Sequence, residues 1–147
     1  MAKFQGGSYY AVDDKGRIVI PMRFRSMLGE RFIITRGFGG CLFVFTADQW
    51  QRLGDRFDDG ALFDPRKIRL QRFLYTNAAE VAPDSQGRVA IPQELRDWAQ
   101  IEPNSEVLIA GCANWVEIWS RSRYETMMQA ELENGDELMQ LAVEMNI

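Results

Sequence analysis

The chain has 147 residues, contains no histidine and carries a formal net charge of −4 at pH 7. The missing histidine excludes Ser-His-Asp and Cys-His catalysis and most zinc sites, so we expect no enzyme, no metal and no cofactor. The length allows one compact domain or two very small ones. We find no secretory leader and no apolar run of membrane-spanning length, and expect a cytoplasmic protein.

Charge is distributed unevenly along the chain. Residues 1–36 contain seven Lys/Arg and three Asp/Glu, whereas residues 125–147 contain six Asp/Glu and no basic residue. Binding to a polyanion depends on the local field rather than on the net charge. The overall value of −4 therefore does not exclude DNA binding by the first segment.

The first predicted elements are a strand over residues 8–12 and a glycine turn. Gly16 can adopt a positive φ without steric cost, and Asp13 can accept backbone N–H bonds that fix the turn. The tip of this predicted hairpin also holds two cations, Lys15 and Arg17. They have little local structural purpose there, which leaves two interpretations: solvated charges, or a basic tip that faces an anion.

A short helix is predicted after the turn. Pro21 suits its first turn because a proline lacks the N–H that would be unsatisfied there. One apolar face follows with i, i+3, i+4 spacing, formed by Phe24, Met27 and Leu28. Residues 31–36 and 41–45 then predict a β-hairpin. The second of these strands is apolar throughout and should be buried on both faces.

Two further helices are predicted from their N-terminal caps. Thr46 is followed three residues later by Gln49, a capping box, and the helix has Trp50, Leu53 and Phe57 on one face. Asp64 caps the next helix, with Pro65 in its first turn. That helix carries four basic residues, Arg66, Lys67, Arg69 and Arg72. They could contact DNA, or form a solvated face opposite a packed one.

The turn and its helix then recur seventy-one positions later. Asp13, Gly16, Arg17, Ile20 and Pro21 recur as Asp84, Gly87, Arg88, Ile91 and Pro92. The helix face recurs as Leu95, Trp98 and Ala99, and Arg25 recurs as Arg96. This agreement at one offset indicates an internal duplication. Each half alone is too small for a stable core, so we expect the two halves to share one.

The rest of the second half repeats the hairpin. Residues 106–110 and 115–119 predict its strands, and a helix should begin near Ser120 or Ser122 and end at 134–135. Apolar residues at helical spacing follow in the acidic tail, 136–147. This tail could pack on a neighbouring subunit or remain loose. The two cysteines, Cys41 and Cys112, are expected to be buried free thiols.

The motifs together resemble a known family. They are the two Asp-x-x-x-Arg turns, the Gly-Arg-(hydrophobic)-x-Ile-Pro continuation, and Asp64-Pro65-Arg66 followed by Gln71-Arg72-Phe73. From about Phe4 to Tyr124 the sequence is similar to the MraZ family, bacterial transcriptional regulators related to AbrB-type swapped-hairpin DNA-binding domains.

The resemblance implies an α+β fold, an internally duplicated AbrB-like swapped-hairpin β-barrel with short flanking helices. We place the first repeat at 4–57, a linking helix at 58–76, the second repeat at 77–133 and the acidic tail at 134–147. The family's activity implies a ring-like homo-oligomer that binds repeated boxes in double-stranded DNA. Such proteins act chiefly as repressors of the division and cell-wall gene cluster that includes their own gene, which implies association with the nucleoid.

The candidate DNA-binding residues are Lys3, Lys15, Arg17, Arg23, Gln86 and Arg88, and the turn-structuring residues are Asp13, Gly16, Asp84 and Gly87. The first turn should dominate, because Gln86 stands where the first copy has Lys15. The two helix arginines, Arg25 and Arg96, could touch DNA or form ion pairs with Asp13 and Asp84. The alternative function is a structural or interaction ring without direct DNA binding.

Overall fold

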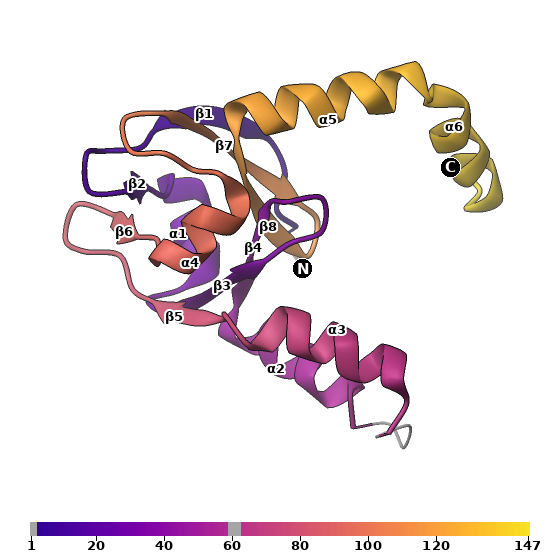
Figure 1. Ribbon diagram of the computed structural model, residues 1–147, viewed down its shortest axis with the longest axis horizontal. Helices are drawn as coiled ribbons and strands as arrows, with labels where there is room; N and C mark the ends of the chain where they lie inside the picture. The colour runs from indigo at the N-terminus through magenta and orange to yellow at the C-terminus, as the bar shows by residue number, and fades with distance from the viewer. Residues whose placement is uncertain (1–2, 59–62) are drawn as a thin grey trace.

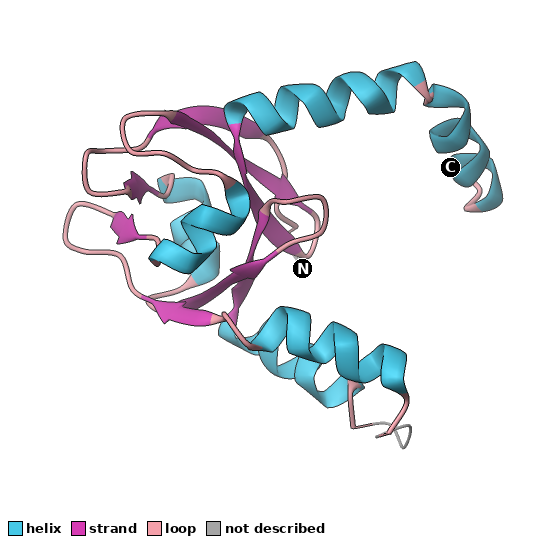
Figure 2. Cartoon of the chain, viewed as in Figure 1, coloured by secondary structure: helices cyan, strands magenta, loops and turns pink. Residues whose placement is uncertain are grey.

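The computed structural model describes residues 3–58 and 63–147. A six-stranded sheet, a two-stranded sheet and helices on both sides of the larger sheet make up the molecule (Figures 1 and 2). In chain order the elements are β1 (Gly7–Ala11), β2 (Arg17–Val19), α1 (Met22–Leu28), β3 (Phe32–Arg36), β4 (Leu42–Thr46), α2 (Ala47–Arg56), α3 (Pro65–Tyr75), β5 (Ala79–Val81), β6 (Arg88–Ala90), α4 (Gln93–Ala99), β7 (Glu106–Cys112), β8 (Trp115–Ser120), α5 (Arg121–Glu133) and α6 (Gly135–Glu144).

The larger sheet shows the duplication directly. Its strand order is β1-β7-β8-β4-β3-β5, with every neighbouring pair antiparallel. Equivalent strands of the two repeats lie at mirrored positions, and β8 and β4 meet at the centre. The first strand of each repeat pairs with the hairpin of the other repeat, since β1 joins β7 and β5 joins β3. The two halves are therefore one folding unit.

The smaller sheet joins the two turns. β2 pairs with β6 in an antiparallel register that places Ile18 opposite Val89. These two side chains are buried, whereas Val19 and Ala90 are exposed. The alternation of a half-buried strand thus holds even in three residues. The ladder also brings two segments about seventy residues apart in the chain side by side.

Two sequence predictions about the strands need correction. The strands that flank each turn do not form a hairpin with each other, because β1 pairs with β7 and β2 pairs with β6. The predicted closed swapped-hairpin barrel is not confirmed either. Among the described residues, the larger sheet ends at β1 and β5 and is open. The α+β class and the duplication are confirmed.

Apolar side chains fill both faces of the larger sheet. Val44 belongs to a cluster that contains the helix anchors Phe24 and Leu95, while its neighbours Phe43 and Phe45 belong to a second cluster with Trp50 of α2. β4 is thus buried on both faces, as predicted. Full burial of side chains of this size stabilises a fold by about 1.5–3 kcal/mol each. Phe24 and Leu95 therefore fix α1 and α4 firmly beneath the turns.

The predicted helix caps are present. Thr46 accepts a hydrogen bond from the Gln49 backbone N–H, Asp64 Oδ1 accepts one from Arg66 N, and Ser120 accepts one from Arg123 N. The predicted linking segment includes residues 59–62, which lie outside the described part of the chain. Cys41 is a buried free thiol as expected, but Cys112 is exposed, so that prediction is wrong. Within the described residues, no helix is long and apolar enough to cross a membrane.

Candidate nucleic-acid interface

The first turn is organised by the carboxylate of Asp13. Its Oδ1 accepts the backbone N–H groups of Lys15 at 2.9 Å and Arg17 at 2.8 Å, and its Oδ2 accepts Arg17 Nε at 2.6 Å. Gly16 has a φ of +76°, a conformation that favours glycine. Asp13 therefore fixes both the backbone of the turn and the direction of the Arg17 side chain.

The second turn reproduces this arrangement. Asp84 accepts the backbone N–H groups of Gln86 and Arg88 and the Nε of Arg88, each at 2.9 Å. Gly87 has a φ of +79°. The sequence prediction that Asp and Gly structure both turns agrees with this geometry. The interpretation that Arg17 has little local structural purpose is wrong, because it is bonded to Asp13, and Arg88 is bonded to Asp84 in the same way.

The two turns lie at the same end of the molecule. The β2–β6 ladder joins them, and Ile20 N–H donates to Gly87 C=O at 3.1 Å. Figure 1 shows the two loops next to each other at the left edge, away from both helical arms. Lys15 and Gln86 are exposed at the tips, and Arg17 and Arg88 are partly exposed. The fold thus presents two similar turns on one surface.

The helix arginines cross between the repeats. A Cβ atom added to Gly16 would lie 2.5 Å from Nη1 of Arg96, and one added to Gly87 would lie 2.6 Å from Cζ of Arg25. Each guanidinium therefore covers the turn glycine of the other repeat. The ion pairs recorded for Asp13 and Asp84 in the described residues are with Arg17 and Arg88. The structure therefore does not show Arg25 and Arg96 as the ion-pair partners of Asp13 and Asp84.

These crossed contacts change the charge of the turns. Residues 13–17 contain two acids and two bases, and residues 84–88 contain one of each, so each turn is formally neutral. Arg96 adds one positive charge at the first turn, and Arg25 adds one at the second. Sequence reasoning left the roles of Arg25 and Arg96 open. Arg25 and Arg96 occupy matching repeat positions, which indicates that they share a role. That each lies over the turn of the other repeat depends on how the repeats pair in three dimensions.

The aspartates are ionised at neutral pH. The backbone N–H of Arg17 is the main cause that lowers the pKa of Asp13, with further contributions from the Arg17 side chain and Lys15 N–H. The backbone N–H of Arg88 is likewise the main cause that lowers the pKa of Asp84. A hydrogen bond to the charged form favours that form. The carboxylates therefore keep their bonds to the arginines throughout the physiological range.

Two other predicted contact residues lie apart from the tips. Lys3 Nζ donates to Asn114 Oδ1 at 2.6 Å, and the next residue, Phe4, forms a β-bridge with Ala113 between β7 and β8, so Lys3 does not lie beside the turns. Arg23 lies with its Cζ 4.8 Å from the centre of the Phe24 ring and beside Gly6. Of the predicted contact residues, the structure brings together Lys15, Arg17, Gln86 and Arg88.

The fold and this surface define a class of protein: an internally duplicated α+β protein that presents paired arginine-bearing turns. The MraZ family model ("MraZ protein, putative antitoxin-like") matches the chain twice, over residues 4–73 and 74–142. The chain therefore belongs to the MraZ family.

Relatives named "Transcriptional regulator MraZ" support the assignment. The protein of Acetivibrio thermocellus is 39% identical over 92% of this chain and 90% of its own length. The protein of Halothermothrix orenii is 36% identical over 92% of this chain and 93% of its own, and that of Moorella thermoacetica is 35% identical over 98% and 99%. The chain thus matches these relatives over nearly their whole length, and their common name describes a regulator rather than an enzyme.

Proposed function

We propose that this protein is a sequence-specific DNA-binding transcriptional regulator. The observation that carries the proposal is the pair of turns at one end of the fold, each with an arginine held by an aspartate and a second arginine supplied by the other repeat. Arginine and lysine bind phosphates, and arginine can also bond to O6 and N7 of guanine. The similarity to proteins named as transcriptional regulators supports the same function.

The weak charge of one chain requires several copies. Each turn carries a formal charge of only +1 even when its crossed arginine is counted, and the whole chain carries a net charge of −4. One pair of turns reads a few base pairs and binds weakly. Copies arranged in a closed ring present the turns at a fixed spacing, so that linked contacts add as avidity. A ring-like homo-oligomer that binds repeated promoter boxes at the nucleoid follows from this argument.

The family membership supports the finer details of the proposal. The targets are repeated boxes before the division and cell-wall gene cluster, including the protein's own operon, and regulation is chiefly repression. The exchange of β1 and β5 between the repeats supports a relation to the swapped-hairpin domains. These details are tested by a footprint on the upstream region of the protein's own operon at physiological salt.

A titration of three DNA probes tests the array mechanism. The probes carry intact boxes, one deleted box, or one box shifted by about 5 base pairs, half a helical turn. A shifted box lies on the opposite face of the duplex, so the shift should weaken binding as much as deletion does. Equal binding to the shifted and intact probes would mean that each box is bound independently.

The alternative is an interaction ring that does not bind DNA. The exposed apolar residues of α6 favour an assembly role of some kind, since Leu138 and Met139 are 51% and 67% exposed. Salt dependence separates the two functions, because only binding to DNA gives an affinity that falls steeply as the salt concentration rises. If no shift of operon DNA is seen at 50 mM salt, the DNA-binding proposal is wrong.

A further inference from the structure

Within residues 3–58 and 63–147, the side-chain contacts that hold the C-terminal arm, residues 121–147, against the sheets lie at its base. Arg123 Nη1 donates to the carbonyls of Gly40 and Trp98 at 3.0 Å each, and the Tyr124 ring lies against that of Trp119. Farther along, α6 has no buried residue, and Figure 1 shows it at the far end of the arm. Its exposed apolar side chains are Leu138, Met139, Leu141 and Val143, and Met145 at its C-cap is exposed as well. A ten-residue helix is marginal in water without tertiary packing, so this face requires a partner.

The charge of the arm restricts the chemistry of that partner. Residues 125–147 contain no basic residue. Glu125 is paired with Arg121 at 2.9 Å, at the base of the arm. The other acids lie farther along: Glu131, Glu133, Asp136, Glu137 and Glu144. DNA is repelled by this charge. The partner surface must be basic and partly apolar.

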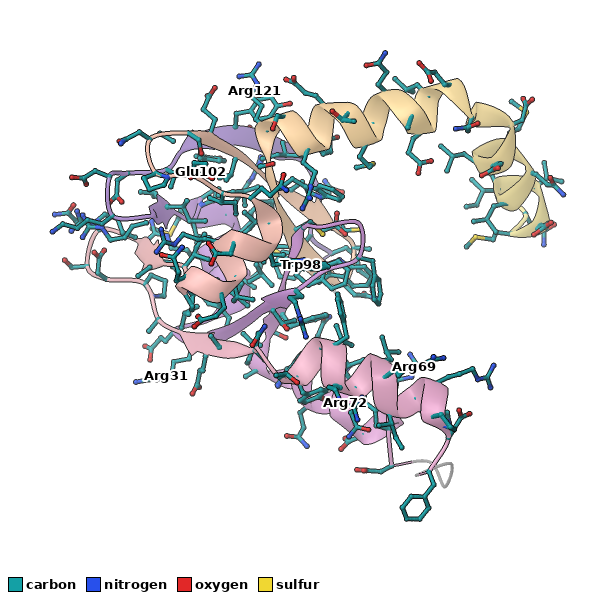
Figure 3. The ribbon with its side chains drawn as sticks, viewed as in Figure 1. Arg31, Arg69, Arg72, Trp98, Glu102 and Arg121 are labelled. Carbon is teal, nitrogen blue, oxygen red and sulfur yellow. The ribbon has the colours of Figure 1, made fainter. Side chains whose placement is uncertain are left out.

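The outer face of α3 has these properties. Arg69 and Arg72 are exposed on it, and α3 itself contains no acidic residue, although Arg66 in its first turn is paired with the N-cap Asp64 at 3.3 Å. Leu70 of α3 is 38% exposed, and Phe63, which precedes the helix and its Asp64 N-cap, is 84% exposed. Figure 3 labels Arg69 and Arg72 on this arm of the molecule. α3 has 11 residues and α6 has 10, so both are about 15 Å long and can lie along each other.

We propose that α6 of one copy docks on the outer face of α3 of a second copy, with apolar contacts along the centre and carboxylate–guanidinium pairs at the edges. The two helices of a single chain are on separate arms in Figure 1, so the contact forms between chains. It joins two different patches and is therefore heterologous, the kind of contact that generates rings. The inference rests on the proposed oligomer and assigns its interface.

Charge exchange between two full-length variants tests the interface. The first variant carries Arg69→Glu and Arg72→Glu, and the second carries Glu137→Lys and Glu144→Lys. Each alone opposes like charges at every contact and should give a smaller species by light scattering, at a concentration where the original protein is assembled. An equimolar mixture restores opposite charges at every contact, and its mass should return to that of the original assembly.

Matched control variants change charge by the same amount elsewhere. Arg31→Glu with Arg56→Glu, and Glu80→Lys with Glu102→Lys, alter exposed residues outside both helices and should keep the full mass. Circular dichroism checks that all variants fold. The inference would be overturned if either test variant alone kept the full mass, or if the mixture did not recover it. A mixture that does not recover is expected if α6 docks on its own chain.

The same experiment keeps the two proposals apart. Loss of DNA binding at full mass in the Arg69/Arg72 variant would assign α3 to DNA instead of to α6. An original protein that is monomeric at micromolar concentration would overturn both the ring and its interface. The original protein could instead be assembled and bind operon DNA while the test variants keep its mass. That result would overturn only the proposed interface.

Discussion

The two turns share one backbone design but differ at their surfaces. In both, an aspartate accepts two backbone N–H groups and an arginine Nε, and a glycine with positive φ lies beneath an arginine from the other repeat. At the tips, Lys15 of the first turn is replaced by Gln86 in the second. The comparison shows that the residues that build the turn are duplicated together with its arginine, whereas the exposed residue at the tip differs between the copies.

The crossed arginines also differ in how they are held. Arg96 Nε donates to Ile91 C=O at 3.0 Å, and its Nη2 donates to Gln93 Oε1 at 2.8 Å. Arg25 Nε is buried and has no hydrogen-bond partner within the described residues. The guanidinium over the first turn is therefore fixed, and the one over the second is held less firmly. The two turns carry the same formal charge, so the first turn is favoured as the main DNA contact by its exposed tip lysine, which can bind a phosphate, and by this firmer support.

The largest effect is expected from Arg17→Ala, which should abolish specific DNA binding. Loss of one phosphate or base contact costs about 1–3 kcal/mol, and every subunit of a ring repeats the loss. The measurement is a gel-shift titration, with circular dichroism and light scattering to show that fold and assembly persist.

Because Arg17 is also bonded to Asp13, Asp13→Asn serves as the control. It removes the ion pair but keeps a side-chain oxygen that can accept the backbone N–H groups. Because Asp13 also directs the Arg17 side chain, binding by Asp13→Asn should weaken, but by less than in Arg17→Ala, which loses the cation itself. An equal loss in both variants would mean that Arg17 only supports the turn, and full binding by folded Arg17→Ala would remove it from the interface.

A smaller loss of affinity is expected from Arg88→Ala, because the second turn lacks the tip lysine. The exchange of Lys15→Gln with Gln86→Lys sharpens this comparison, since it moves the extra cation to the second turn at constant net charge. In the exchanged background, Arg88→Ala should become the more damaging of the two alanine variants. A greater effect of Arg88→Ala in the original background would reverse the ranking of the turns.

Local sequence patterns predicted the helices, the caps and the two hairpins. The spacing of Phe24 and Leu28 defines a helix face, and Thr46 and Asp64 cap their helices without any distant partner. The pairing of β2 with β6 could not be predicted in this way. Ile18 and Val89 are buried together only because the repeats exchange strands. No local sequence pattern near either residue indicates which residue it pairs with.

The candidate site was predictable to the same extent. The duplicated Asp and Gly positions identified both turns, but the sequence did not reveal that each turn is covered by the helix arginine of the other repeat. The basic segment at residues 1–36 predicts Lys3 as a contact residue, whereas its side chain bonds to Asn114. Proximity along the chain predicts charge density, but it does not predict which surface a charge occupies.

The two crossed arginines should differ in their effect on stability. Arg96→Met keeps the aliphatic part of the side chain over Gly16 but removes hydrogen bonds worth about 0.5–1.5 kcal/mol each. Arg25→Met removes a buried Nε that has no described partner, so its cost should be smaller. Urea unfolding measures both. Equal losses would show that the two arginines are held equally in solution.

The smallest expected effect concerns acid stability and the equivalence of the two aspartates. Hydrogen bonds from the backbone N–H groups of Arg17 and Arg88 lower the pKa values of Asp13 and Asp84 in the folded state, while the unfolded value is about 3.9. A lowered folded pKa stabilises the protein above the unfolded pKa, and this contribution is lost as the pH falls through the folded pKa.

The free energy of unfolding of Asp13→Asn should therefore differ from that of the original protein by a constant amount between pH 5 and 8. The difference should begin to shrink below about pH 4, where the carboxylate of the unfolded chain becomes protonated, and it should be lost only as the pH falls through the lower folded pKa. Because the two turns have the same donors, Asp84→Asn should follow the same curve; a difference that persists at pH 2 in only one variant would show that the two turns are not structurally equivalent.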